Sequence, residues 1–204
     1  MRKTALKAAV ISLISLIAAL SLTIAAISLV SPKTMASLCD SAGLKTAAVY
    51  YYRADYERSS DFNKLAVLID AADYADDDKT LAAYGEKFVL SDEFRFFCER
   101  KDESSAVGKI SSYDYYCYLA VTALYNTGKY DKSVSLAYLK TESYTEKCPL
   151  KVAVMIAKAN GNRQYAKAIT ETYENGEKDR IQDVDGSLKN DIEELKAKNI
   201  EKMV

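Results

Sequence analysis

Aromatic residues return at a nearly constant interval along this chain, and no other feature limits its fold as strongly. The residues Phe62, Phe96, Tyr130 and Tyr165 are separated by 34, 34 and 35 positions. A second series, formed by Tyr50, Tyr84 and Tyr118, repeats at 34 positions. A chain that repeats at this length stacks one structural unit on copies of itself. We therefore expect an architecture built of repeated units.

Each interval contains the same succession of apolar and polar segments. The apolar segments occupy matching places in the 34-residue frame, at 47–56, 81–90, 115–125 and 150–159. Short polar breaks follow them at 59–61, 91–92, 126–128 and 160–162. These breaks are rich in the Ser, Asp, Asn and Gly residues of turns and helix caps. Each unit is therefore predicted to be a helix, a tight turn and a second helix.

The third unit carries the clearest similarity to a known family. Its residues 124–133, LYNTGKYDKS, contain a Gly turn, an aromatic residue and a small residue in that order. This arrangement resembles the tetratricopeptide repeat family. The fourth unit has Tyr165 followed by Ala168, and the first has Phe62 with Leu65 and Ala72. The tryptophan typical of the family's first helix is absent, and Val49, Ala83, Cys117 and Val152 stand in that frame. The resemblance covers residues 46–182 and implies an all-α fold, an α-solenoid of about four helical hairpins.

A long apolar segment precedes the repeats. Residues 8–30 contain no charge, and Arg2, Lys3 and Lys7 lie immediately before them. At about 1.5 Å of rise per residue, a helix of this length covers roughly 30 Å, which is enough to cross a bilayer core. We expect an uncleaved transmembrane signal-anchor. The alternative is a cleaved signal peptide, with Thr34-Met35-Ala36 as a loose match to a cleavage site.

The basic residues before the apolar segment predict its orientation, because such residues tend to remain on the cytoplasmic side of a first membrane segment. We therefore expect a single-pass protein of the cell membrane with a cytoplasmic basic segment at 1–7. A linker at 31–45 and the repeat domain would lie outside the cytoplasm. The chain lacks an Asn-X-Ser/Thr glycosylation sequence. Together with the basic and then apolar start, this fits a bacterial exported protein.

The overall composition excludes several classes of function. The 28 basic and 29 acidic residues are nearly balanced, so they predict no basic surface for nucleic acid. The chain has no histidine, which removes Ser-His-Asp and Cys-His nucleophiles and histidine metal centres. No glycine-rich phosphate loop is present. We therefore expect no cofactor and no catalysis.

The four cysteines are Cys39, Cys98, Cys117 and Cys148. They contain no C-x-x-C pair, and the repeat frame places Cys117 on the packed side of a helix, where a reduced thiol acts as a small apolar group. A bridge between Cys98 and Cys117 in neighbouring units remains open, since an oxidising location would favour disulfides. We expect the reduced state and no zinc site.

Two acidic segments are candidates for chemistry. The first is the run Asp70, Asp73, Asp76, Asp77 and Asp78. A carboxylate pair can cleave glycosides, but a run of charges at a helix boundary more often forms a solvated loop and a helix cap. We adopt the second interpretation.

The second acidic segment, 183–194, resembles an EF-hand calcium loop. Oxygen-bearing side chains stand at Asp183, Asp185, Ser187, Asp191 and Glu194. However, Leu188 occupies the place of the turn glycine, and no second hand exists. We interpret the segment as the cap of a last helix at 187–204, whose apolar stripe is Leu188, Ile192, Leu195 and Met203.

The family resemblance implies a binding surface. It places Tyr50, Tyr84 and Tyr118 on the concave side of successive first helices, and it extends this surface to Arg58, Tyr125 and Asn126. Tyrosine combines a large apolar area with a polar tip and is enriched at interface hot spots. The alternative is that these rings pack between helices in place of the missing tryptophans.

The sequence therefore predicts a membrane-anchored scaffold that docks a protein or an extended peptide in a concave groove, without chemistry. One alternative is an anchored or secreted enzyme that uses carboxylates on carbohydrate. Another is a calcium-responsive surface protein, which depends on the loop that begins at Asp183.

Overall fold

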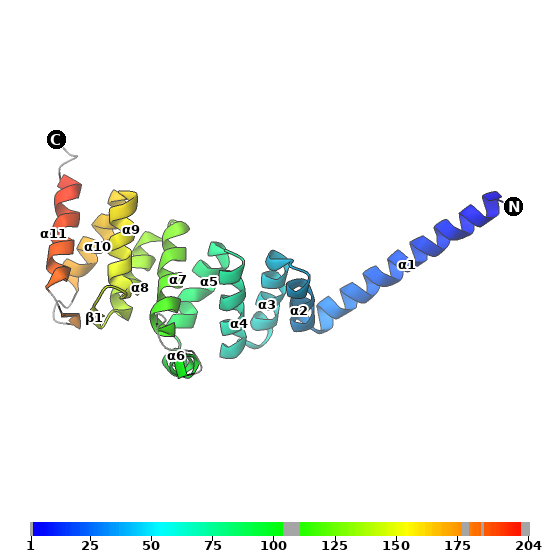
Figure 1. Cartoon of the computed structure of the whole chain (residues 1–204), viewed down its shortest axis with the longest axis horizontal. Coiled ribbons are helices and arrows are strands. Elements are labelled where there is room, and N and C mark those ends of the chain that lie inside the picture. The colour runs from blue at the N-terminus through cyan, green and yellow to red at the C-terminus, as the bar shows by residue number, and fades with distance from the viewer. Residues whose placement is uncertain (1, 104–110, 177–179, 185, 201–204) are drawn as a thin grey trace. The chain divides into compact units, whose positions relative to one another are not determined.

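The computed structural model describes residues 2–103, 111–176, 180–184 and 186–200, apart from the side chains at 2–11, 28–29 and 198–200 (Figure 1). Helices make up about 81% of the chain, so the all-α prediction is confirmed. The chain divides into two compact units, Met1–Ala75 (unit 1) and Asp76–Val204 (unit 2). The division falls inside the segment that resembles a repeat family.

The described part of unit 1 contains four helices: α1 (Arg2–Val30), α2 (Pro32–Ser41), α3 (Lys45–Ser59) and α4 (Phe62–Tyr74). Helix α3 packs against both α2 and α4. It ends at Ser59, and the next residue, Ser60, adopts a left-handed conformation with φ of 52°. The Asp61 side chain then accepts a hydrogen bond from the Lys64 backbone N–H at 3.1 Å. The predicted helix, turn and helix are therefore present. The expected linker at 31–45 contains α2, which the sequence analysis did not predict.

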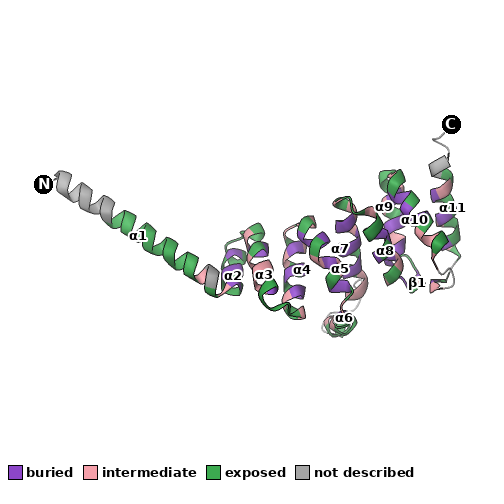
Figure 2. Cartoon of the chain, turned by 180° about the vertical axis from the view of Figure 1, so that it is seen from behind, coloured by how far each residue is buried: buried purple, intermediate pink, exposed green. Residues whose placement is uncertain are grey.

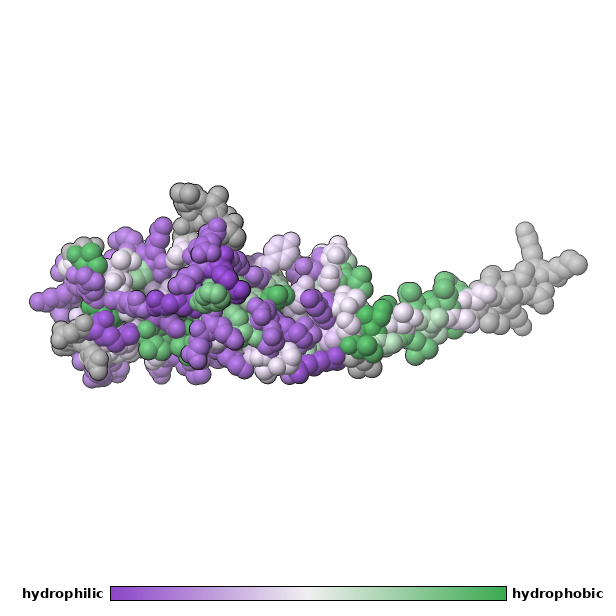
Figure 3. All heavy atoms as spheres, turned by 90° about the horizontal axis from the view of Figure 1, so that it is seen from below, coloured by the Kyte–Doolittle hydropathy of each residue, from purple (hydrophilic) through white to green (hydrophobic). Residues whose placement is uncertain are grey.

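Helix α1 is continuous over 29 residues, and its side chains from 12 to 26 are exposed (Figure 2). Figure 3 shows that the described atoms of this helix are largely apolar. In the described part of the chain, no single helix meets the length and apolarity that crossing a membrane requires. The segments Ser12–Ile27 and Pro32–Ser41 meet them only as a pair bent by 118°. The transmembrane signal-anchor at 8–30 stays a prediction.

Unit 2 contains seven helices among its described residues: α5 (Asp78–Val89), α6 (Phe94–Glu103), α7 (Ser112–Asn126), α8 (Tyr130–Lys140), α9 (Pro149–Asn160), α10 (Arg163–Asn175) and α11 (Ser187–Ile200). A short parallel ladder joins β1 (Ser143–Tyr144) to β2 (Gln182–Asp183). Its register pairs Ser143 with Gln182. This ladder was not predicted, because two-residue strands leave no periodic signal.

The polar breaks begin and end the helices of unit 2 as expected. Gly128 and Gly161 have φ values of 75° and 60°, which residues with side chains rarely adopt. The side chains of Asp77 and Asn162 each accept a hydrogen bond from the backbone N–H three residues later, both at 3.1 Å. The prediction that the acidic run forms a helix cap is therefore confirmed at Asp77.

Aromatic rings fill much of the core of unit 2. Phe88 is fully buried, and its ring centroid lies 5.2 Å from those of Phe94 and Tyr116 in edge contacts. The Tyr165 ring is also fully buried, and its hydroxyl lies 2.7 Å from that of Ser133. Of the repeating aromatic residues, Tyr130 is the first residue of α8 and Tyr165 lies two residues after the start of α10. Both rings pack between helices.

All four cysteines are buried and unpaired. Cys117 is fully buried on α7, so its predicted packing position is confirmed. Burial raises the pKa of the Cys98 and Cys117 thiols to about 12. Both thiols are therefore protonated at neutral pH and react slowly as nucleophiles.

Helix α11 closes the end of unit 2. Leu188, Ile192 and Leu195 are buried, which confirms the predicted apolar stripe for these three residues. Met203 lies outside the described residues. Helix α11 packs against α9 and α10, as expected of a capping helix.

Candidate functional site

Helices α5 and α7 approach each other closely, and this approach positions two of the predicted site residues. A Cβ atom placed on Gly85 would lie 3.1 Å from the Ala120 Cβ, so only a residue without a side chain fits there without displacement. Tyr84 lies next to Gly85, and Tyr118 lies two residues before Ala120. The two tyrosines therefore lie within one helical turn of the crossing point.

Tyr118 lies on an exposed stripe of α7. Its exposed fraction is 43%, and that of Tyr115, one turn earlier, is 37%. One turn later, the hydroxyl oxygen of Thr122 is buried and has no hydrogen-bond partner among the described residues. The spacing from 115 to 118 and 122 places the three side chains on one helical face. Tyr115 and Thr122 were not among the predicted site residues, although their helical spacing from Tyr118 indicates the shared face.

Tyr125 and Asn126, at the end of α7, already have partners inside unit 2. The Tyr125 ring is half-buried, with its centroid 4.7 Å from that of Tyr165 and 5.4 Å from that of Tyr130. The Asn126 side chain is exposed and donates a hydrogen bond to the Asp78 carboxylate at 2.9 Å. Tyr125 thus serves packing between helices, and Asn126 joins the end of α7 to the start of α5.

The remaining predicted site residues lie on α3 of unit 1. Tyr50 is exposed at 56%, and its ring makes an edge contact with that of Tyr51 at 5.3 Å. Arg58 is also exposed. The structure brings Tyr84 and Tyr118 onto neighbouring helices of unit 2. The alignment of Tyr50 with them stays a prediction.

Helix α9, which packs against α7, carries a second exposed stripe. Met155 has an exposed fraction of 53%, and Val152 and Ile156 are partly buried. Val152 stands in the place of Cys117 in the repeat frame, so Ala153, which is fully buried, occupies the place of Tyr118. The side chain at that place changes from aromatic in α5 and α7 to aliphatic in α9.

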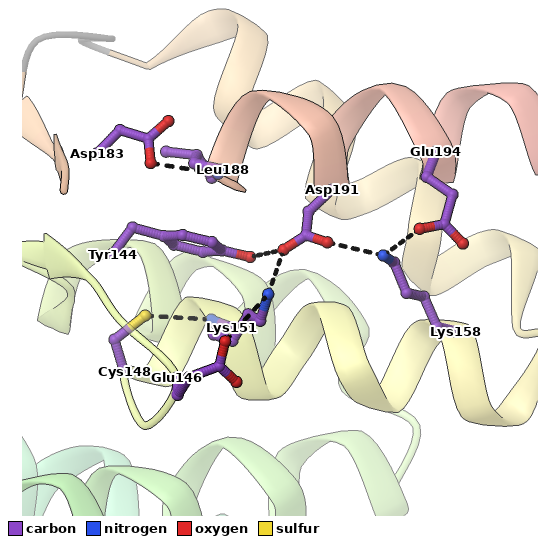
Figure 4. A network of polar contacts seen from close by, with 9 residues as sticks. All are labelled: Tyr144, Glu146, Cys148, Lys151, Lys158, Asp183, Leu188, Asp191 and Glu194. Atoms are coloured by element: carbon purple, nitrogen blue, oxygen red, sulfur yellow. Dashed lines mark hydrogen bonds and ion pairs between the residues drawn. The ribbon is translucent and has the colours of Figure 1, made fainter. Parts of the chain in front are cut away.

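A polar network binds α11 to α9 (Figure 4). The Asp191 carboxylate accepts hydrogen bonds from the Tyr144 hydroxyl at 2.6 Å and from the Lys151 and Lys158 ammonium groups, each at 2.7 Å. Lys158 also pairs with Glu194. These contacts use both oxygens of Asp191, and they come from β1 and from two turns of α9.

The electrostatics of this network keep its charges fixed. Burial by itself raises the pKa of Asp191, but the hydrogen bonds from the two lysines and the tyrosine outweigh burial and lower the pKa to about 2. Burial and the bond to Asp191 raise the pKa of Tyr144. Asp191 is therefore ionised and Tyr144 neutral throughout the physiological range. Neither group titrates near neutral pH, as a general acid or base would have to.

The loop that resembles a calcium site is engaged in these contacts. Asp191 and Glu194 bind lysines, and the Asp183 carboxylate accepts a hydrogen bond from the Leu188 backbone N–H at 3.3 Å. Asp185 lies outside the described residues. Within the described ones, no cluster of three or more acidic or thiol side chains could hold a metal ion.

A cleft of about 340 Å³ lies between α6, the start of α7 and the segment 140–149. Three of its four lining carboxylates have internal partners: Asp102 accepts hydrogen bonds from the Ser112 N–H and hydroxyl, Asp114 accepts one from the Ser111 hydroxyl, and Glu142 pairs with Arg95. Burial raises the pKa of the lining Tyr113 hydroxyl to about 12. These carboxylates stabilise the start of α7 and the contact between α6 and the segment before β1.

No protein-family model, curated protein or solved structure matches this chain.

Proposed function

We propose that unit 2 is a docking module that binds a protein or an extended peptide on the exposed face of α5 and α7, without chemistry. The observation that carries this proposal is the exposure of Tyr115 and Tyr118 on α7, next to the close contact between Gly85 and Ala120. Rigid helices that present exposed aromatic side chains are typical of binding surfaces, because a tyrosine contributes large contact area at low entropic cost.

The module is tetratricopeptide-like in this proposal, and its repeats form an α-solenoid. Three observations support that interpretation. In unit 2 the helix pairs α7 and α8, and α9 and α10, each pack as hairpins joined by short turns, and α3 and α4 of unit 1 form a hairpin of the same kind. The aromatic residues at 62, 130 and 165 lie at or near the start of each second helix. Helix α11 covers the apolar side of the last pair.

The proposal also places the module outside the cytoplasm, held by α1 as an uncleaved, single-pass anchor. In support, α1 is one continuous helix, its residues from 8 to 30 are uncharged, and the preceding Arg2, Lys3 and Lys7 favour a cytoplasmic start.

A photo-crosslinking amino acid at position 118, in intact cells, tests both the surface and its location. We expect an adduct with a partner protein, and we expect externally added protease to digest that adduct. Ser135 is also exposed but lies on α8, so the same substitution there should give no adduct. An adduct that resists external protease would exclude the proposed orientation, and equal adducts at 118 and 135 would exclude the proposed surface.

Tyr118→Ala then measures the contribution of the ring. Binding to the captured partner should weaken about tenfold or more, which corresponds to a loss of about 1 to 2 kcal/mol of binding free energy. A loss of this size is expected when an interface hot spot is removed. The thermal midpoint should change little because Tyr118 is substantially exposed. A buried tyrosine would instead lose roughly 3 to 5 kcal/mol of folding stability, and that result would assign Tyr118 to packing.

A further inference from the structure

Unit 1 carries a cleft that the tyrosine surface does not include. Two adjoining hollows, of about 460 and 110 Å³, lie along α3 between α2 and α4. They share Tyr52 and Val67, so together they form one groove with these two residues at its middle.

This groove lies on a different side of α3 from Tyr50. Residues two positions apart on an α-helix are separated by about 200° around its axis. Tyr50 is exposed, whereas Tyr52 is partly buried beneath the groove. The groove is therefore separate from the surface proposed above.

Charge is divided between the two ends of the groove. Lys33 and Lys64 line one end, and Asp40 and Asp70 line the other. Lys64 pairs with Asp55 at 3.0 Å, whereas Lys33 and Asp40 make no ion pair within the described residues. One end therefore keeps an available cation and the other an available anion.

This division runs against what helix stability favours. Anions stabilise the N-terminal turn of a helix and cations the C-terminal turn, because of the helix dipole. In α2 and α4 the first turn contains no acidic residue and the last turn no basic one. In α2 the order is reversed, with Lys33 in the first turn and Asp40 in the last. The positive N-terminal end of the α2 dipole therefore coincides with Lys33, and the negative C-terminal end with Asp40. The electric field along the groove points from the Lys33 end to the Asp40 end.

The middle of the groove is apolar. Val67 is 45% exposed, although Tyr52 and Ala71, which line the same groove, are partly buried. Burial and the negative charge of Asp40 raise the pKa of the Tyr52 hydroxyl, which indicates that the field of Asp40 reaches the floor. An apolar side chain from a ligand would cover Val67 and remove it from water.

We propose that the groove between α2 and α4 binds an extended segment of another protein that carries an acidic and a basic side chain three positions apart, with apolar residues between them. The acidic side chain pairs with Lys33 and the basic one with Asp40. Lys33 and Asp40 are seven positions apart on α2, about 10 Å at 1.5 Å per residue. An extended segment in the polyproline II conformation rises about 3.1 Å per residue and has three residues per turn, so side chains three positions apart lie on one face and cover roughly this distance.

Fluorescence anisotropy with the full-length chain in detergent micelles tests this proposal. The probes are labelled Ser-rich decapeptides with the central sequence Glu-Leu-Val-Lys or its reverse, Lys-Val-Leu-Glu, because either chain direction is compatible with the groove. A matched peptide contains Gln-Leu-Val-Gln. We expect at least one charged peptide to bind tenfold or more tightly than the neutral one.

Asp40→Lys identifies the site. This variant should bind the preferred peptide at least tenfold more weakly. It should bind tightly again when the Lys of that peptide is replaced by Glu. This variant places a cation at the end of α2, which favours the helix, so loss of binding would not reflect unfolding. Asp92→Lys, in an exposed turn of unit 2, and Tyr118→Ala should leave binding unchanged.

Three results would overturn the proposal: equal binding of charged and neutral peptides, equal effects of Asp40→Lys and Asp92→Lys, or no binding of any peptide at millimolar concentration. Because Tyr118→Ala tests the surface of unit 2 separately, failure here leaves the docking function of unit 2 intact.

Discussion

Two helix contacts in unit 2 depend on different interactions, one on apolar packing and the other on ion pairs and hydrogen bonds. Where α5 meets α7, a glycine and an alanine allow close approach, and buried aromatic rings fill the space beside them. Where α9 meets α11, a carboxylate receives two ammonium groups and a phenol (Figure 4). The first contact lies within the row of helices, and the second lies at its end.

The difference between apolar and ionic contacts indicates what each contributes to the fold. An internal contact gains stability from apolar burial and dense packing. An ionic contact gains less, because both charges lose hydration, but it tolerates only the arrangement that pairs them. The network around Asp191 therefore suits a helix that must dock once, in one register, and leave its outer face in water.

Phe88→Ala breaks the internal contact and should have the largest effect. The ring is fully buried and touches Phe94, Phe97 and Tyr116. Its removal should lower the free energy of unfolding by roughly 3 to 5 kcal/mol, through lost burial and a residual cavity. Chemical denaturation followed by circular dichroism measures the change, and a loss below about 1 kcal/mol would contradict this account of the packing.

Asp191→Asn breaks the terminal contact and should cost less, about 1 to 3 kcal/mol, because hydrogen-bonding capacity remains while Lys151 and Lys158 lose their counterion. Amide hydrogen exchange should locate the loss in α9 and α11 and spare α5 and α7. Uniform loss of protection across unit 2 would show that the two contacts are not separable.

The same network predicts a dependence of stability on pH. Asp191 has its pKa lowered to about 2 from an ordinary value near 4, so its contribution is complete above about pH 4 and is lost as the pH falls towards 2. The contact between α5 and α7 has no such group in its centre. Acid titration should therefore release α11 before α5, and Asp191→Asn should remove that difference.

Glu86→Ala should have the smallest effect. The Glu86 carboxylate pairs with Lys132 at 3.1 Å, but the Lys132 side chain is 62% exposed. Exposed ion pairs contribute at most about 1 kcal/mol, so the midpoint of unfolding should barely change. A loss of stability as large as that of Asp191→Asn would mean that the difference in burial between the two ion pairs does not determine their contributions to stability.

The helices were predictable because their signals are local. The polar breaks carry caps such as Asn162 and turn glycines such as Gly161, and the cap acts on a residue three positions away. Helix α2 was missed although Ser31 and Pro32 stand at its start, because the preceding apolar segment dominated the interpretation.

Contacts between distant elements were less predictable. The partners of Asp191 lie 33 to 47 residues away, on β1 and α9, and no spacing rule connects them. For the same reason the contact of the Tyr125 ring with that of Tyr165, 40 residues later, could not be foreseen. Exposure of Tyr118 follows from helical position, but the groove of unit 1 depends on α2 and could not be foreseen without it.

Because all four thiols are buried, their reaction with an external reagent reports local opening of the structure. A buried cysteine reacts with an external thiol reagent only when its surroundings open, so its labelling rate measures the population of the open form. Cys39 lies in α2, Cys98 in α6, Cys117 in α7 and Cys148 at the start of α9. Each therefore times the opening of a different part of the molecule, and no engineered label is required.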